Sequence, residues 1–284
     1  MADGPVHTLI QITDVHICRA ADAGQEPVDT HAVLDRALRA VQEVAPTPSA
    51  VLLTGDLTEH GAPEEYRRLR ALVEPALARL GTRAVYLAGN HDERAALREH
   101  LLGGEGGGEP LDRVERFGDL RVIALDSTVP GRAYGELGAD QLEWLRAELA
   151  TPAPAGTVLA LHHPPLPSPV PLATSIELSN RAALADAIAG TDVRVVLAGH
   201  THVVSAGVLA GVPVWTGGSI APMLDSLVTD GALRGLAVPS VNRIDLFADA
   251  VLVTNLPVAA EVVLELPADA MRAKIADLRA QLPA

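Results

Sequence analysis

The stretch that decides the fold is residues 193–202, which read VRVVLAGHTH. The run of Val, Leu and Ala predicts a buried strand, and Gly199 allows the chain to turn sharply just before His200 and His202. Four other short aliphatic runs end in the same way, with DVH at 14–16, GD at 55–56, GNHD at 89–92 and HHP at 162–164. Because sites in α/β sheets are built where strands end, we expect these polar side chains to gather at one edge.

Outward from this stretch, the first 200 residues alternate between aliphatic runs and helical patterns. Strands are expected at 6–13, 50–54, 84–88, 120–125, 157–161 and 193–198, and helices at 28–44, 63–80, 93–102, 139–149 and 180–189. This alternation predicts an α/β layered fold. After His202, runs at 203–209, 212–216, 241–246, 250–255 and 261–266 predict a second sheet without crossover helices, and residues 268–282 have helical spacing.

Charge and composition exclude several classes of function. The chain has 284 residues, with 22 basic and 36 acidic side chains and a net charge of −14. A nucleic-acid binder needs clustered Lys and Arg, so we expect no nucleic-acid partner. The single cysteine, Cys18, excludes a disulfide scaffold. No apolar run reaches about 18 residues, so we expect no stable membrane insertion and a cytoplasmic protein.

The residue types after the strands indicate a metal site. Residues i and i+2 at a strand end point the same way, so Asp14 and His16 can share one cation, and His200 and His202 can face the same site. Carboxylate, amide and imidazole together suit Mn, Fe and Zn. Each piece alone is weak, since Gly-Asp is a common turn dipeptide, but five pieces in order, each after a strand, favour a metal centre.

The ordered set D-x-H, G-D, G-N-H-[D/E], H and G-H-x-H resembles the calcineurin-like metallophosphoesterase superfamily, over residues 7–220. The segments GNHDERAALREHLL, LRVIALDSTVPG and GTDVRVVLAGHTH look like class III cyclic nucleotide phosphodiesterases of actinobacterial type. The resemblance implies a four-layer α/β/β/α sandwich over 1–266. A C-terminal helix at 267–284 would then pack on this domain or form a dimer interface, and a homodimer is expected.

The same resemblance implies a metal-dependent phosphodiesterase. Its substrates would be small phosphodiesters, namely 3′,5′-cAMP and cGMP, with 2′,3′-cyclic nucleotides as further candidates, and its products nucleoside monophosphates. It implies two metal ions per chain, manganese or iron, with zinc as an alternative. Metal 1 would take Asp14, His16, Asp56 and His202, and metal 2 would take Asp56, Asn90, His162 and His200. The family pattern places the ligand on His162 rather than His163.

Three of these residues are implied to be catalytic. Asp56 would bridge the metals, Asn90 would stabilise the phosphoryl oxygens, and His91 would face the phosphate as electrophile or general acid. Two divalent cations and the carboxylates of Asp14 and Asp56 leave a net positive site for a phosphodiester anion and a hydroxide. Cations about 3.5–4 Å apart can bridge one water and lower its pKa towards about 7, so we expect that hydroxide to attack phosphorus in line.

Substrate contacts are expected from Asn90, His91 and His163. The loop at 126–137 departs from the family, because relatives can carry histidines where this chain has Arg132-Ala133-Tyr134. Arg132 and Tyr134 are therefore candidates to replace those contacts, with a plain surface role as the alternative for Arg132.

Other functions stay open. One is a promiscuous metallophosphoesterase that acts on another phosphodiester or on a phosphomonoester, such as a glycerophosphodiester, a nucleotide-sugar or a lipid pyrophosphate. A phosphoprotein phosphatase is disfavoured, because Ala88 stands where such enzymes carry an arginine and LTE at 57–59 replaces their D-R-G run. A metal-free scaffold for protein binding is also disfavoured, because all seven candidate ligands and His91 are present.

Overall fold

The computed structural model describes the whole chain except residues 1–3, 23–26, 229–231, 259 and 280–284. Its strands are β1 (His7–Ile12), β2 (Ala50–Thr54), β3 (Ala84–Leu87), β4 (Arg113–Phe117), β5 (Leu120–Ala124), β6 (Thr157–Ala160), β7 (Val193–Ala198), β8 (Ser205–Leu209), β9 (Val212–Thr216), β10 (Met223–Leu224), β11 (Gly235–Leu236), β12 (Ser240–Leu246) and β13 (Val251–Pro257). Its helices are α1 (Thr30–Gln42), α2 (Pro63–Leu80), α3 (Arg94–Leu97), α4 (Ala139–Leu149), α5 (Pro171–Thr174), α6 (Arg181–Ile188) and α7 (Ala268–Arg279).

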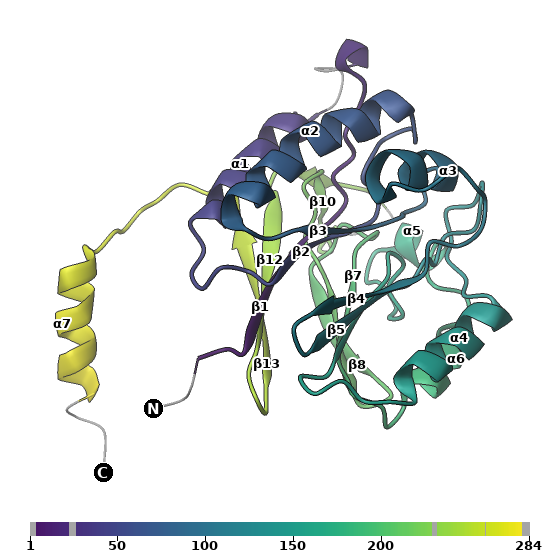
Figure 1. The fold of residues 1–284 in the computed structure, drawn as a ribbon. Coiled ribbons are helices and arrows are strands. Elements are labelled where there is room, and N and C mark those ends of the chain that lie inside the picture. Colours follow the sequence, from purple (N-terminus) through teal and green to yellow (C-terminus); the bar gives the residue numbers. More distant parts are fainter. Residues whose placement is uncertain (1–3, 23–26, 229–231, 259, 280–284) are drawn as a thin grey trace.

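Two sheets lie face to face with helices on their outer faces (Figure 1). The first sheet has the order β13-β12-β1-β2-β3 and the second the order β4-β5-β6-β7-β9-β8. α1 and α2 cover the first sheet, and α4 and α6 cover the second. The predicted four-layer α/β/β/α architecture is confirmed.

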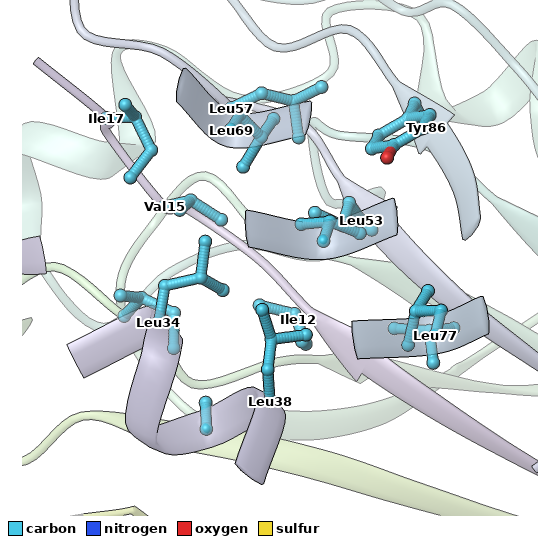
Figure 2. Packing of buried hydrophobic residues seen from close by; sticks show 14 of the residues in the cluster. Ile12, Val15, Ile17, Leu34, Leu38, Leu53, Leu57, Leu69, Leu77 and Tyr86 are labelled. Carbon is cyan, nitrogen blue, oxygen red and sulfur yellow. The ribbon is translucent and has the colours of Figure 1, made fainter. Parts of the chain in front are cut away.

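Alternation along β1 shows how the layers are held together. Ile10 and Ile12 face the helices and pack with Leu34 and Leu38 of α1, while Leu9 faces the second sheet. Figure 2 shows the helix-facing part of this core, where Ile12 lies beside Leu34 and Leu38. Burying one such aliphatic side chain contributes about 1.5–3 kcal/mol, so this packing keeps β1 and the residues after it in place.

α1 and α2 begin where local chemistry predicts. The Asp29 carboxylate accepts a hydrogen bond from the Ala32 N–H at 3.0 Å and caps α1. Pro63 opens α2, and Gly81, with a φ of 69°, ends it in the left-handed conformation that favours glycine. The predicted helix at 63–80 is therefore confirmed to the residue, while the one at 28–44 is shorter, because Asp29 caps it.

The parallel strands set the position of the site. β1, β2 and β3 run parallel to one another, as do β5, β6 and β7. Their carboxyl ends carry the residues singled out from the sequence.

Several sequence expectations were wrong. The runs expected to form a separate sheet after His202 join the two main sheets: β12 and β13 extend the first sheet antiparallel to β1, and β9 and β8 extend the second from β7. Only the short strands β10 and β11 of the described residues pair by themselves there. An alternating run predicts a strand but not its partner. Residues 261–266 form no strand, and β4 was missed because three of its five residues are charged, as suits an exposed edge strand. The helix expected at 93–102 is α3 followed by a π-helical turn at Arg98–Leu102.

The C-terminal segment stands apart from the sandwich (Figure 1). The described residues from 260 to 278 are all exposed, including Val263 at 89% and Leu264 at 77%. α7 therefore does not pack on the domain in this structure, and its role at a dimer interface stays a prediction. Among the described residues, no helix has the length and apolar character needed to cross a membrane.

Candidate metal centre

The polar residues after five parallel strands converge at one end of the sandwich. Asp14, Asp56 and Asn90 follow β1, β2 and β3 of the first sheet. His162 and His200 follow β6 and β7 of the second sheet, and their rings lie 4.9 Å apart. The two sheets thus bring together ligand-type residues that lie as many as 186 positions apart in the sequence.

Backbone strain is concentrated at the same place. Six described residues other than glycine have a positive φ, and one of them, Ala210, lies in the β8–β9 turn. The other five are all predicted ligands: Asp14 (52°), His16 (48°), Asp56 (46°), His200 (70°) and His202 (51°). Such a conformation costs about 1–3 kcal/mol per residue and persists only where the surrounding structure enforces it, as is common in functional sites.

Each of the four predicted histidine ligands is held from behind through one ring nitrogen. The outer partners are Glu59 Oε2 for His16 Nδ1 (2.7 Å), the Thr54 carbonyl for His162 Nδ1 (2.9 Å), the Ile176 carbonyl for His200 Nε2 (2.8 Å) and the Pro222 carbonyl for His202 Nδ1 (2.9 Å). A proton on the outer nitrogen leaves the inner nitrogen as a free acceptor. Histidines that bind metals are oriented in this way.

The two aspartates lie among the inner nitrogens. Oδ2 of Asp56 is 3.3 Å from Nε2 of His162 and 3.6 Å from Nε2 of His16. Oδ1 of Asp14 is 3.4 Å from Nε2 of His202. Asp56 therefore lies between one histidine from each sheet, which is the position that a bridging carboxylate requires.

Unpartnered buried atoms test whether these residues fit metal ions. Buried polar atoms are nearly always hydrogen-bonded, and leaving one without a partner costs about 1–3 kcal/mol. Four predicted ligands each have a buried atom with no hydrogen-bond partner: Nε2 of His16, Oδ1 of Asn90, Nε2 of His162 and Nδ1 of His200. Nitrogen and oxygen donors in this mixture suit Mn, Fe and Zn, so the residues fit a metal centre.

In the absence of metal ions, protons on the histidines supply part of the positive charge beside Asp56. Burial opposes the charged form of His16, but the hydrogen bond with Glu59 and the charge of Asp56 raise its pKa to about 9. Burial likewise opposes the charged form of His162, and the charge of Asp56 raises its pKa to about 9. Burial also opposes ionisation of Asp56, yet these histidines hold its pKa well below its usual range.

We expect the metal-free protein to lose stability as the pH rises from 6.5 to 9. His16 and His162 titrate at about 6.5 when unfolded and at about 9 when folded, so their contribution is complete below pH 6.5 and is lost through pH 9. His200, whose pKa burial lowers to about 4, and Asp92, whose pKa burial raises to about 6, titrate below this window.

The expected loss is a few kcal/mol, which is a fall of several degrees in Tm. Thermal unfolding followed by circular dichroism at pH 6, 7.5 and 9 would measure it, with protein loaded with Mn²⁺ as the control. The loaded protein should not show this fall, because its ring nitrogens are held without a proton. Equal falls in both samples would contradict this reading of the site.

Comparison with known proteins decides the family. The family model described as calcineurin-like phosphoesterase matches residues 7–204, which is well over half of the chain. The chain belongs to the calcineurin-like phosphoesterase family. Enzymes of this family use a dinuclear metal centre, and this phosphoesterase has the candidate His and Asp ligand groups for one.

Curated relatives of this phosphoesterase match it over most of its length. A cAMP/cGMP dual specificity phosphodiesterase of Mycobacterium tuberculosis is 41% identical over 254 residues, which is 89% of this chain and 80% of the relative. A probable cyclic nucleotide phosphodiesterase of Rhodococcus erythropolis is 39% identical, covering 94% of this chain and 88% of the relative.

A dimetal phosphatase from Danio rerio is similar in structure. It has a TM-score of 0.66 at 15% identity, with 91% of this chain and 98% of that chain covered. At that identity the likeness supports the fold alone.

His91 lies beside the metal cluster of the phosphoesterase. Its ring centroid is 4.7 Å from that of His16, and its backbone N–H donates a hydrogen bond to Oδ1 of Asp56 at 2.9 Å. Its Nδ1 donates to the Glu59 carbonyl at 2.9 Å, and its side chain is 36% exposed. The second ring nitrogen is thus available to a substrate.

Both ring nitrogens of His163 are held by protein groups in this structure, and its contact with a substrate stays a prediction. Its side chain is fully buried, its Nε2 donates to the Ala133 carbonyl at 3.2 Å, and its Nδ1 accepts from the Ser127 hydroxyl at 2.9 Å. Burial and the neighbouring His162 lower its pKa well below the usual range, so the ring is neutral. His163 therefore supports the 127–137 loop, because both of its nitrogens are used within the protein.

The other two candidate contacts lie on that loop. Arg132 is exposed. Tyr134 lines a cavity together with Thr174, Glu177 and Arg181, and none of the predicted metal ligands lines this cavity. Their contact with a substrate stays a prediction.

Two carboxylates at the site of the phosphoesterase were missed from the sequence. Glu59 orients His16, and Asp92 accepts hydrogen bonds from the N–H groups of Leu57 and Gly89, which joins the loop after β2 to the loop after β3. Asp92 follows Asn90 and His91 directly, and Glu59 lies three residues after Asp56. Their nearness to the motifs was the available signal.

Replacing Glu59 by Gln should weaken metal binding about 10- to 100-fold, because the carboxylate that orients His16 and increases its basicity is lost. Competition with a chelating dye would measure the affinity for Mn²⁺. Glu65→Gln is a matched control, since Glu65 hydrogen-bonds to His60 away from the cluster. Wild-type affinity in the Glu59 variant would show that the hydrogen bond is dispensable.

Proposed function

We propose that this phosphoesterase hydrolyses the 3′,5′-cyclic nucleotides cAMP and cGMP to nucleoside monophosphates. The observation that carries the reaction is the set of unpartnered nitrogen and oxygen atoms around Asp56, drawn from both sheets. The substrate class rests on the similarity to cyclic nucleotide phosphodiesterases over about nine-tenths of the chain.

Two metal ions would be held by the seven predicted ligands. Metal 1 would bind Asp14, His16, Asp56 and His202, and metal 2 would bind Asp56, Asn90, His162 and His200. Divalent cations there would polarise the phosphoryl oxygens and lower the pKa of a water that attacks phosphorus. Manganese and iron are the proposed metals, and the same donor atoms also suit zinc.

The chain's own residues position the phosphodiester and supply a proton. Once Oδ1 of Asn90 faces a metal, its amide NH₂ can donate to a phosphoryl oxygen. The backbone N–H of His91 is held by Asp56, and its ring is held by the hydrogen bond from Nδ1 to the Glu59 carbonyl. A proton on its Nε2 can then pass to the departing 3′ oxygen of the ribose. An alkoxide leaves poorly without a proton, and such general acid catalysis contributes about 10²- to 10⁴-fold.

The test is hydrolysis of 3′,5′-cAMP by the protein loaded with Mn²⁺. Reactions with 2′,3′-cAMP, bis-p-nitrophenyl phosphate and p-nitrophenyl phosphate run beside it, with Asn90→Ala as the control. Metal-dependent turnover of cAMP that the variant loses is the expected result. Activity on the aryl diester with none on cAMP would retain the site chemistry and overturn the cyclic nucleotide assignment.

We further propose that the phosphoesterase is a homodimer in which the segment from 260 to 278 is covered by the second copy. The exposure of Val262, Val263 and Leu264 supports this, since monomers rarely leave adjacent aliphatic side chains in water. Light scattering of the full chain and of a chain ending at residue 258 would test it. A full chain that is monomeric at micromolar concentration would remove the proposal.

A further inference from the structure

A small cavity opens on one side of the metal cluster, between the start of α1 and the segment after β9. Its volume is about 170 Å³. It borders the rings of His16 and His202 and is otherwise lined by Pro27, Val28, Thr30, Glu59, Ala221 and Pro222. The mechanism uses none of the four aliphatic residues in this wall.

The chemistry of the wall suits a flat apolar ring with a polar edge. Pro27, Val28, Ala221 and Pro222 offer no side-chain hydrogen-bonding group. The hydroxyl of Thr30 is already used, because it donates to the His16 carbonyl at 3.0 Å. Oε1 of Glu59 lies 3.7 Å from Nδ1 of His91, beyond hydrogen-bond distance, and can therefore accept from an amino group.

A second cavity, which borders the cluster at Asn90, is chemically different. It has a volume of about 210 Å³, and its wall includes Asn90, Glu93, Arg94 and Thr128. The guanidinium of Arg94 is already engaged there, since it lies 2.8 Å from Oδ2 of Asp126 and donates to the Thr128 carbonyl. Placing an aromatic ring in this cavity would desolvate charged groups without giving them a partner, which is unfavourable.

We propose that the cavity at Val28 and Pro222 receives the nucleobase of the cyclic nucleotide. This inference rests on the proposed function. With the phosphate beside His91 and the base among the prolines, the amino group of adenine or guanine would reach Glu59. Apolar walls with a few placed polar groups are the usual composition of a small-molecule pocket.

A matched pair of variants tests the assignment. Val28→Phe fills the proposed base cavity, and Val129→Phe makes the same change in the wall of the cavity at Asn90. Steady-state kinetics would be measured on 3′,5′-cAMP and on methyl p-nitrophenyl phosphate, which has no base. Thermal unfolding and metal content would verify folding, and Val28→Ala, which enlarges the cavity, serves if Val28→Phe does not fold.

In Val28→Phe, the ratio of kcat/KM for cAMP to that for the methyl ester should fall about tenfold or more, chiefly through KM, because the phenyl ring takes up the space that the base would fill. The ratio should stay within about twofold of wild type in Val129→Phe. A fall in Val129→Phe with none in Val28→Phe would overturn the inference and assign the base to the cavity at Asn90. Hydrolysis of cAMP by wild type separates that outcome from failure of the proposed function, in which wild type itself would be inactive on cAMP.

Discussion

Asp56→Asn should strip the enzyme of both metal ions and lower kcat/KM for cAMP by about 10³-fold or more. The Asp56 carboxylate is the group that joins the two halves of the cluster, with Oδ2 close to the inner nitrogens of both His16 and His162. Asn has nearly the same shape, so the hydrogen bond from the His91 N–H can persist while the negative charge is lost. Removing one electrostatic contact in an active site costs about 10²- to 10³-fold, and losing the cations costs more.

Metal analysis of the purified variant provides a measurement that does not depend on turnover. Wild type should retain two Mn²⁺ ions per chain after gel filtration, and Asp56→Asn should retain fewer than one. Asp245→Asn is the matched control, because Asp245 is also buried and bonded, to Thr8 and Arg243, but takes no part in the cluster. Two retained ions in Asp56→Asn would show that Asp56 does not bridge.

His91→Gln should have the second largest effect on activity, but unlike Asp56→Asn it should leave the metal content unchanged. We expect kcat for cAMP to fall about 10²- to 10⁴-fold while both metal ions stay bound, because His91 is not one of the seven predicted ligands and its hydrogen bond to Asp56 comes from the backbone N–H. Its ring lies beside His16 but is held by the Glu59 carbonyl, so its removal leaves the inner nitrogens unchanged.

The choice of substrate sharpens this prediction. The loss should be smaller on bis-p-nitrophenyl phosphate, because p-nitrophenolate leaves without needing a proton. His31→Gln is the control for a histidine outside the cluster. An equal loss on both substrates would exclude general acid catalysis by His91 and leave it an electrostatic role.

Much of the fold and of the candidate site could be predicted from the sequence, because the site residues come directly after strands that the sequence pattern identifies. Each ligand follows a short aliphatic run, and the parallel order of β1, β2 and β3 is enough to bring Asp14, Asp56 and Asn90 to one edge of the first sheet. The helix-facing and sheet-facing sides of β1 also follow from simple alternation.

The rest depended on distant partners. An alternating run does not say which strand it will join, so the hairpin of β12 and β13 was assigned to the wrong sheet. The two ring nitrogens of His163 contact Ser127 and Ala133, and no local sequence pattern predicts these partners. Glu59 was missed for the same reason, since its partner His16 lies 43 residues away.

The central claim is that one carboxylate, Asp56, holds two metal ions between the sheets. The most direct test is anomalous diffraction at the manganese absorption edge from crystals of the protein loaded with Mn²⁺. We expect two peaks about 3.5–4 Å apart, with Asp56 bound to both, His16 and His202 on one and His162 and His200 on the other. A single peak, or two peaks that Asp56 does not join, would contradict this claim.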